Sequence, residues 1–139
     1  MRLILSITIL VAVSLVSCQS AERKTKWLNT DMPNKLNGMK IHYQYSGGNS
    51  YNIHYKNDSL CYQFLNGGRP NAWWGPFEYH HMMTDQNEHI VGWYENGYGD
   101  YITQIIDFEQ NYLIGSGVIM PDTIIHFQRA KILGVEVEK

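Results

Sequence analysis

The chain has 139 residues, of which 44% are hydrophobic, so it is long and apolar enough for one domain with its own core. Its formal net charge is −2, and its Lys and Arg residues form no cluster beyond the stretch "ERKTK" at 22–26. Nucleic acid is therefore excluded as a partner, because binding it requires a basic footprint.

The chain begins with "MRLILSITILVAVSLVSC", in which Arg2 precedes an apolar run over residues 3–16. This run is too short to span a membrane comfortably, and the small residue Ser17 stands near its end. The pattern predicts a secretory signal peptide over residues 1–17 rather than a helix of the fold.

The stretch "LVSC" at 15–18 resembles the bacterial lipobox, in which a signal peptidase cuts just before the cysteine. The resemblance implies that Cys18 is lipidated and that the protein is anchored to a membrane of the bacterial cell envelope, facing the periplasm or in the outer membrane. An ordinary signal peptide cut nearby is the alternative. If Cys18 carries lipid, Cys61 has no disulfide partner, and packing alone must hold the fold.

Residues 18–36 are polar and lack periodicity, which predicts a lipidated N-terminus and a tether ahead of a domain over residues 37–139. Eight β-rich runs follow, separated by short turn sequences such as "GGN", "NDS" and "NGYG". The expected strands cover residues 39–46, 50–56, 59–65, 77–83, 89–95, 100–108, 112–119 and 123–130.

The short connections predict antiparallel neighbours, because parallel strands need a long crossover. Eight such strands remove their free edges by closing into an up-and-down barrel, and a barrel of this size has room for one small ligand. The fold class is therefore all-β, with a two-sheet sandwich as the main competitor.

Alternation along each strand assigns the inward face. The residues expected to line the lumen are Tyr43 and Tyr45 in the first strand, Tyr51 in the second, Tyr62 in the third, and Trp93 with Glu95 in the fifth. A simple core does not need so many phenols, since each buried hydroxyl requires a partner that a ligand or water could supply. Tyrosines with wet tips at the barrel mouths are the alternative.

Glu95 stands two residues after Trp93 and in phase with it. Inside a barrel its pKa would be raised by desolvation, and it could serve as a general acid near neutral pH. At a strand end it could equally lie in solvent beside the "NGYG" turn.

The stretch "RPNAWWGP" at 69–76 carries two tryptophans in a loop. It could form a lid, a carbohydrate-stacking platform or a plug for one barrel end. The plug is favoured because surface tryptophans are costly without a partner, and Trp73 is expected to contact the ligand.

The sequence offers no metal or cofactor site. His80 and His81 are adjacent and so point to opposite faces of a strand, and no glycine-rich stretch opens a helix.

Several stretches are similar to bacterial phenolic acid decarboxylases and the related MoaF-like domains, which are calycin-like (lipocalin-like) barrels. They are "HYQYSGGNSYNIHYKND" with "YQF", "GWYENGYGD" and "LIGSGVIMPDTIIHFQ", and they span about residues 37–130. The resemblance implies that Tyr43 and Tyr45 hold a substrate carboxylate and that Glu95 handles the proton.

Two positions depart from the decarboxylase pattern. Ala72 stands before Trp73 where the family has an arginine, and Asn96 follows Glu95 where the family usually has proline. The decarboxylases are also cytosolic and carry a longer C-terminal extension.

Three functions remain open at this point. The first is a lipid-anchored barrel that binds a small aromatic or amphipathic molecule in its lumen. The second is a cofactor-independent, non-oxidative decarboxylase of phenolic acids, with Glu95, Tyr43 and Tyr45 catalytic. The third is a structural envelope lipoprotein whose barrel is filled by its own side chains.

Overall fold

The computed structural model describes residues 36–138, so the predicted signal peptide, Cys18 and the predicted tether up to residue 35 lie outside the described residues. Eight antiparallel strands in sequential order form a closed barrel. Their bounds are β1 Met39–Tyr45, β2 Ser50–Lys56, β3 Ser59–Phe64, β4 Trp74–Met83, β5 His89–Glu95, β6 Asp100–Asp107, β7 Tyr112–Ile119 and β8 Ile124–Val137.

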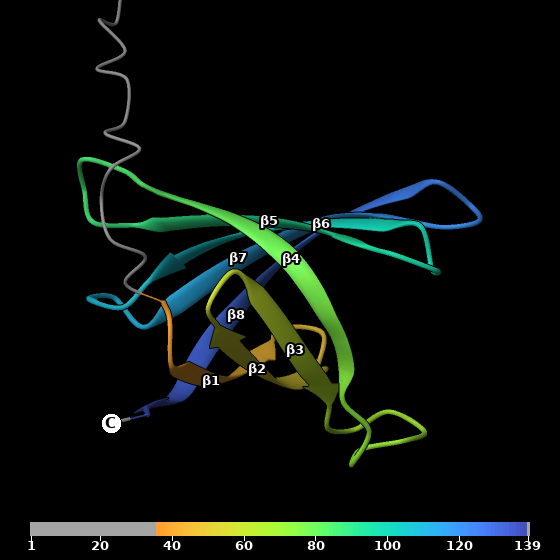
Figure 1. The fold of residues 1–139 in the computed structure, drawn as a ribbon, viewed down its shortest axis with the longest axis horizontal. Helices are drawn as coiled ribbons and strands as arrows, with labels where there is room; N and C mark the ends of the chain where they lie inside the picture. The colour runs from red at the N-terminus through yellow and green to blue at the C-terminus, as the bar shows by residue number, and fades with distance from the viewer. Residues whose placement is uncertain (1–35, 139) are drawn as a thin grey trace, which may run out of the picture.

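The last strand closes the barrel. The 14-residue β8 pairs with β7 along its first part and with β1 along its second, and Lys131 stands opposite both Tyr112 and Gln44. Figure 1 shows the C-terminus beside the start of β1. There Gly38 and Glu138 share backbone hydrogen bonding, with the Glu138 amide 2.8 Å from the Gly38 carbonyl oxygen.

The prediction of an eight-stranded up-and-down barrel is confirmed. Two strands are longer than expected. β4 begins at Trp74 instead of residue 77, and β8 continues to Val137 instead of ending at residue 130, because its second part supplies the partner for β1. The described part of the chain contains no helix long and apolar enough to cross a membrane.

The barrel interior is packed solid at one end. The apolar side chains there include Ile41, Ile53, Leu60, Ile106 and Leu113, all of which are buried. Leu36, just before β1, is fully buried against the same cluster, so the chain enters the barrel at this packed end. Burial of such side chains supplies the main favourable contribution to folding, about 1.5–3 kcal/mol for each large one.

Candidate functional site

A cavity of about 270 Å³ occupies the opposite end of the barrel, near the β1–β2, β3–β4, β5–β6 and β7–β8 connections. It is close to the lower size limit of ordinary small-molecule pockets. Its lining residues are Tyr43, Tyr45, Asn49, Tyr51, Tyr62, Trp93, Glu95, Asp100, Ile102, Gln104, Gly115, Ser116, Gly117, Ile119, His126 and Gln128.

The β5–β6 turn places two carboxyl groups at this cavity. Gly97 and Gly99 have φ angles of +95° and +86°, which other residues rarely adopt, and the chain reverses tightly there. The Glu95 carbonyl oxygen accepts hydrogen bonds from the amides of Tyr98 at 3.1 Å and Gly99 at 2.9 Å. As a result Glu95 and Asp100 stand opposite each other across the hairpin.

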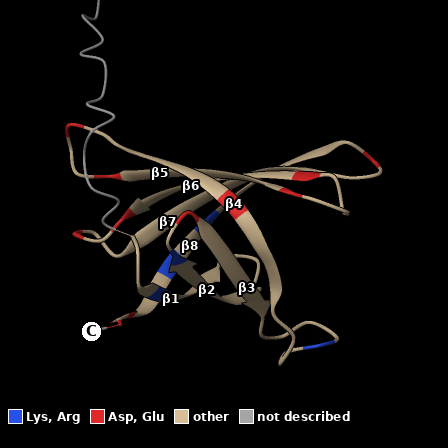
Figure 2. Cartoon of the chain, viewed as in Figure 1, with Lys and Arg blue, Asp and Glu red and all other residues tan. Residues whose placement is uncertain are grey.

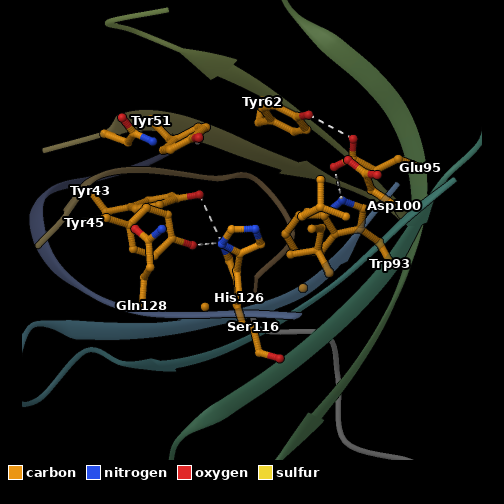
Figure 3. Close-up of a pocket in the computed structure, with 16 residues that line it drawn as sticks. Tyr43, Tyr45, Tyr51, Tyr62, Trp93, Glu95, Asp100, Ser116, His126 and Gln128 are labelled. Atoms are coloured by element: carbon orange, nitrogen blue, oxygen red, sulfur yellow. Dashed lines mark hydrogen bonds between the residues drawn. The ribbon is translucent and has the colours of Figure 1, made fainter. Parts of the chain in front are cut away.

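Glu95 is inside the barrel, with only 4% of its surface exposed. The Trp93 indole donates a hydrogen bond from Nε1 to Oε1 at 3.1 Å, and the Tyr62 hydroxyl donates to Oε2 at 3.0 Å (Figure 3). Burial raises the pKa of the Glu95 carboxyl, and these two hydrogen bonds partly oppose the rise because they favour the charged form. The acid is therefore fixed in orientation by two aromatic side chains.

On the other side of the cavity, a buried amide ties the phenols together. Gln104 donates from Nε2 to the hydroxyl oxygen of Tyr43 at 3.0 Å and to that of Tyr45 at 3.4 Å. Its Oε1 accepts from the Tyr55 hydroxyl at 3.5 Å. These bonds satisfy polar groups that would otherwise be costly inside a barrel.

The phenols remain protonated at physiological pH. Burial raises the pKa of Tyr43 well above its ordinary value of 10.0, and it also raises the pKa of Tyr45. The pKa of Tyr51 rises to about 12 through burial, with the neighbouring Tyr45 and Glu95 adding to the rise. The cavity thus offers neutral hydroxyls, and Glu95 is the group best suited to exchange a proton.

The aromatic rings form a continuous wall. Tyr51 stacks on Phe64 with ring centroids 4.8 Å apart and on Tyr43 at 5.6 Å. Tyr62 meets Tyr51 edge to face at 6.2 Å and stacks on Trp74 at 5.9 Å. Such contacts restrict the rings, so the cavity is preformed.

The hollow exists because β7 carries glycines at inward positions. Leu113 fills the packed end, but Gly115 and Gly117, which follow it on the same face, leave space. The Tyr45 hydroxyl lies directly over Gly115, where a Cβ atom would collide with it. A Cβ atom at Gly117 would meet the Ile102 side chain.

The remaining wall of the cavity comes from β8. Gln128 has a buried Oε1 with no hydrogen-bond partner among the described residues, and His126 lies beside it on the same face. No Lys or Arg side chain is among the described residues that line the cavity.

The structure brings together six of the seven side chains that the sequence proposes for ligand contact. Tyr43, Tyr45, Tyr51 and Tyr62 line the cavity, as do Trp93 and Glu95. Of the two locations considered for Glu95, the interior is the one observed.

The structure does not place Trp73 in the cavity. Its side chain is 48% exposed, and its ring lies against His54 outside the barrel, with centroids 6.5 Å apart. The predicted plug is wrong, because no residue of 65–73 lines the cavity and the loop projects away from the barrel (Figure 1). Trp74, the first residue of β4, is the tryptophan that packs on the lumen wall, through Tyr62.

Several residues that line the cavity were not predicted from the sequence, chiefly Asp100, Gln104 and Gln128. Alternation could have found Gln104, because it stands in phase with Ile102 and Ile106 on the same face of β6. Asp100 could have been found as the partner of Glu95 across a tight hairpin.

Residues 36–138 contain no group of three or more His, Cys, Asp or Glu side chains placed to hold a metal ion. A pair of histidines does meet inside the packed end, where His81 Nε2 lies 2.9 Å from His89 Nδ1. Cys61 is half-buried and forms no disulfide within the described part of the chain.

No model of a known protein family matches this chain, and no curated protein matches its sequence. Sixteen chains of solved structures do match its fold. One is described as "a putative beta-lactamase from Burkholderia vietnamiensis"; it has a TM-score of 0.64 and 16% sequence identity, and the match covers 77% of this chain and 99% of that chain. At this identity the likeness concerns the fold alone.

Proposed function

We propose that the barrel binds a small aromatic or amphipathic organic molecule in its open end. The observation that carries the proposal is the preformed cavity of about 270 Å³, walled by tyrosines and Trp93 and holding a buried carboxyl. A side-chain-filled barrel would not leave a hollow beside oriented polar groups, since empty space forfeits packing contacts. The kinship with MoaF-like domains belongs to this proposal and rests on the sequence motifs.

The proposal includes attachment to the bacterial envelope through a lipidated Cys18. In support, the chain enters the barrel at Leu36, at the packed end, whereas the cavity lies at the other end. An anchor on the N-terminal segment would therefore leave the entrance accessible to small molecules.

The proposal is tested with the full chain in detergent, titrated with 2-phenylethylamine, 2-phenylethanol and 3-phenylpropionate while the fluorescence of Trp93 and the other tryptophans is followed. We expect saturable binding of at least one compound. Gly117→Val, whose side chain enters the cavity beside Ile102, should abolish that binding.

Gly134→Val is the matched control. Gly134 lies on β8 and is not among the residues that line the cavity, and a Cβ atom there meets nothing within 4 Å. It should bind like the unmodified protein. Absence of binding by all three compounds and by benzyltrimethylammonium, or equal binding by both valine variants when circular dichroism shows both folded, would contradict the proposal.

A second candidate is a phenolic acid decarboxylase, favoured by one observation: Tyr43, Tyr45 and the buried Glu95 share a cavity. Loss of CO₂ needs the substrate carboxylate held and a carbon protonated, and Glu95 has the raised pKa that a general acid requires. Turnover of p-coumarate or ferulate by pure protein, abolished in Glu95→Gln, would establish this activity. No decay of the cinnamate absorbance would dismiss it.

The description of the structural neighbour as a β-lactamase does not assign that activity to this chain. Serine β-lactamases use a Ser-x-x-Lys motif, and no serine of this chain is followed three residues later by lysine.

A further inference from the structure

The charges around the cavity bear on the kind of guest it accepts. Glu95 and Asp100 bring two carboxyl groups to one side of it, and no Lys or Arg lines it within the described residues. Figure 2 shows acidic positions at the end of β5 and the start of β6, while the basic ones lie on β1, on β2, on β8 and in the β3–β4 loop. An anionic guest would meet two carboxyl groups with no Lys or Arg of the described residues to balance it, which costs free energy in a partly dry site.

The walls beside Glu95 are aromatic side chains. Trp93 and Tyr62 both hydrogen-bond to this acid, and Tyr51 lies edge to face with Tyr62 at 6.2 Å. A carboxylate fixed among aromatic side chains offers an organic ammonium group a charge partner, and the rings offer an apolar surface for the body of the guest.

The hydrogen-bonding capacity of the cavity also favours a cationic guest. Each Glu95 oxygen accepts one bond from the protein, yet an ionised carboxylate has about four acceptor sites, so capacity remains for a donor from the guest. The unpartnered Oε1 of Gln128, on the side of Tyr43 and Tyr45, is a further acceptor (Figure 3). The cavity therefore has unused acceptors at both of its sides.

We infer that the guest is an organic cation, a primary or quaternary amine on a small, largely apolar body, with its ammonium group beside Glu95 and among Trp93, Tyr62 and Tyr51. The inference rests on the proposed binding function and names the chemical class of the ligand. It differs from what the decarboxylase resemblance implies, because a carboxylate substrate would carry the opposite charge.

The test compares compounds of one shape and different charge on the full chain in detergent, by isothermal titration calorimetry. The cations are 2-phenylethylamine and benzyltrimethylammonium, the neutral compound is 2-phenylethanol, and the anion is 3-phenylpropionate. We expect the better cation to bind at least tenfold more tightly than the neutral compound, and the anion to bind most weakly.

Variants assign the preference to the cavity. Glu95→Gln keeps a hydrogen-bonding side chain for Trp93 and Tyr62, so it should lower the affinity for the cation at least tenfold and leave that for 2-phenylethanol unchanged. Asp100→Asn should lower the cation affinity by a smaller factor. Asp122→Asn, which removes an exposed acid from the β7–β8 turn, should change nothing.

The outcomes separate the two proposals. If the alcohol or 3-phenylpropionate binds as tightly as the cations, or if Glu95→Gln leaves cation binding intact, the inference is wrong while the binding function stands. If none of the four compounds binds, both are wrong.

Discussion

The two halves of the barrel interior are built on the same alternating pattern but have opposite contents. In the packed half most inward residues are apolar, such as Ile53, Leu60 and Leu113, and they pack against one another. In the open half the inward residues include phenols, two carboxyl groups and two glycines, and they surround a cavity. The difference indicates that the packed half stabilises the fold and the open half forms the binding site. Because the two roles are separate, the site can be hollow and polar while the barrel stays folded.

The largest loss of stability is expected when a buried side chain of the packed half is truncated. Ile53→Ala should lower the free energy of unfolding by about 2–5 kcal/mol, because it leaves a cavity among fully buried side chains. Urea denaturation measures the change. Ile125→Ala is the matched control, since Ile125 is 64% exposed on the outer wall and should cost less than about 1 kcal/mol. Equal losses from the two variants would refute the assignment of stability to the packed half.

A smaller loss of stability is expected from a substitution in the closely packed part of the open half. Gly115→Ala places a methyl group against the Tyr45 hydroxyl, so the ring must shift, at a cost of about 1–3 kcal/mol. It should also disturb the hydrogen bond between Gln104 and Tyr45. Gly134→Ala in β8, where a Cβ atom meets nothing within 4 Å, should be neutral. A neutral Gly115→Ala would mean that Tyr45 does not lie over this glycine.

The open half should lose stability as pH rises. Because burial raises the pKa of Glu95 above its ordinary 4.5, folding favours the neutral carboxyl, and the contribution it makes at low pH is lost as pH rises through the folded-state pKa. Glu95→Gln should therefore be more stable than the unmodified protein at pH 7–8, by at most about 1 kcal/mol, with the difference vanishing below pH 4.5.

Melting temperatures across this range measure the effect. Glu78→Gln, an exposed acid on β4, is the control. A lower stability of Glu95→Gln at pH 7–8 would show that the charged carboxyl is favoured by the fold, contrary to this account.

The packed half should respond to pH in the opposite direction. Burial lowers the pKa of His81 from its ordinary 6.5, so folding favours the neutral ring, and its contribution is full above pH 6.5 and lost as pH falls below it. His81→Gln, which can still bond to His89, should reduce the loss of stability between pH 7 and 5 by up to about 1 kcal/mol. His80 precedes His81 on β4 and is exposed, so His80→Gln should leave the loss of stability between pH 7 and 5 unchanged. An identical acid response in both variants would remove His81 as the cause.

Alternation predicted the inward set well because a strand turns its side chains in a fixed order, and Tyr43, Tyr51 and Trp93 follow it. Alternation could not place Trp73, since side chains in a loop do not alternate between two faces. The adjacent Trp74 lies in β4 and packs against Tyr62, whereas Trp73 does not. Nor could alternation predict the hollow itself. That depends on which inward residues face one another across the barrel, and the glycines of "GSG" could equally have served a turn.

The central claim is that the open half is a preformed site for a guest beside Glu95. The most direct test is a crystal structure of the full chain grown with 2-phenylethylamine. The account predicts electron density inside the cavity, with the amine nitrogen within hydrogen-bonding distance of the Glu95 carboxylate and the ring among Tyr51, Tyr62 and Trp93. Density for the amine only on the outer wall, or a cavity closed by collapse of the tyrosines, would contradict it.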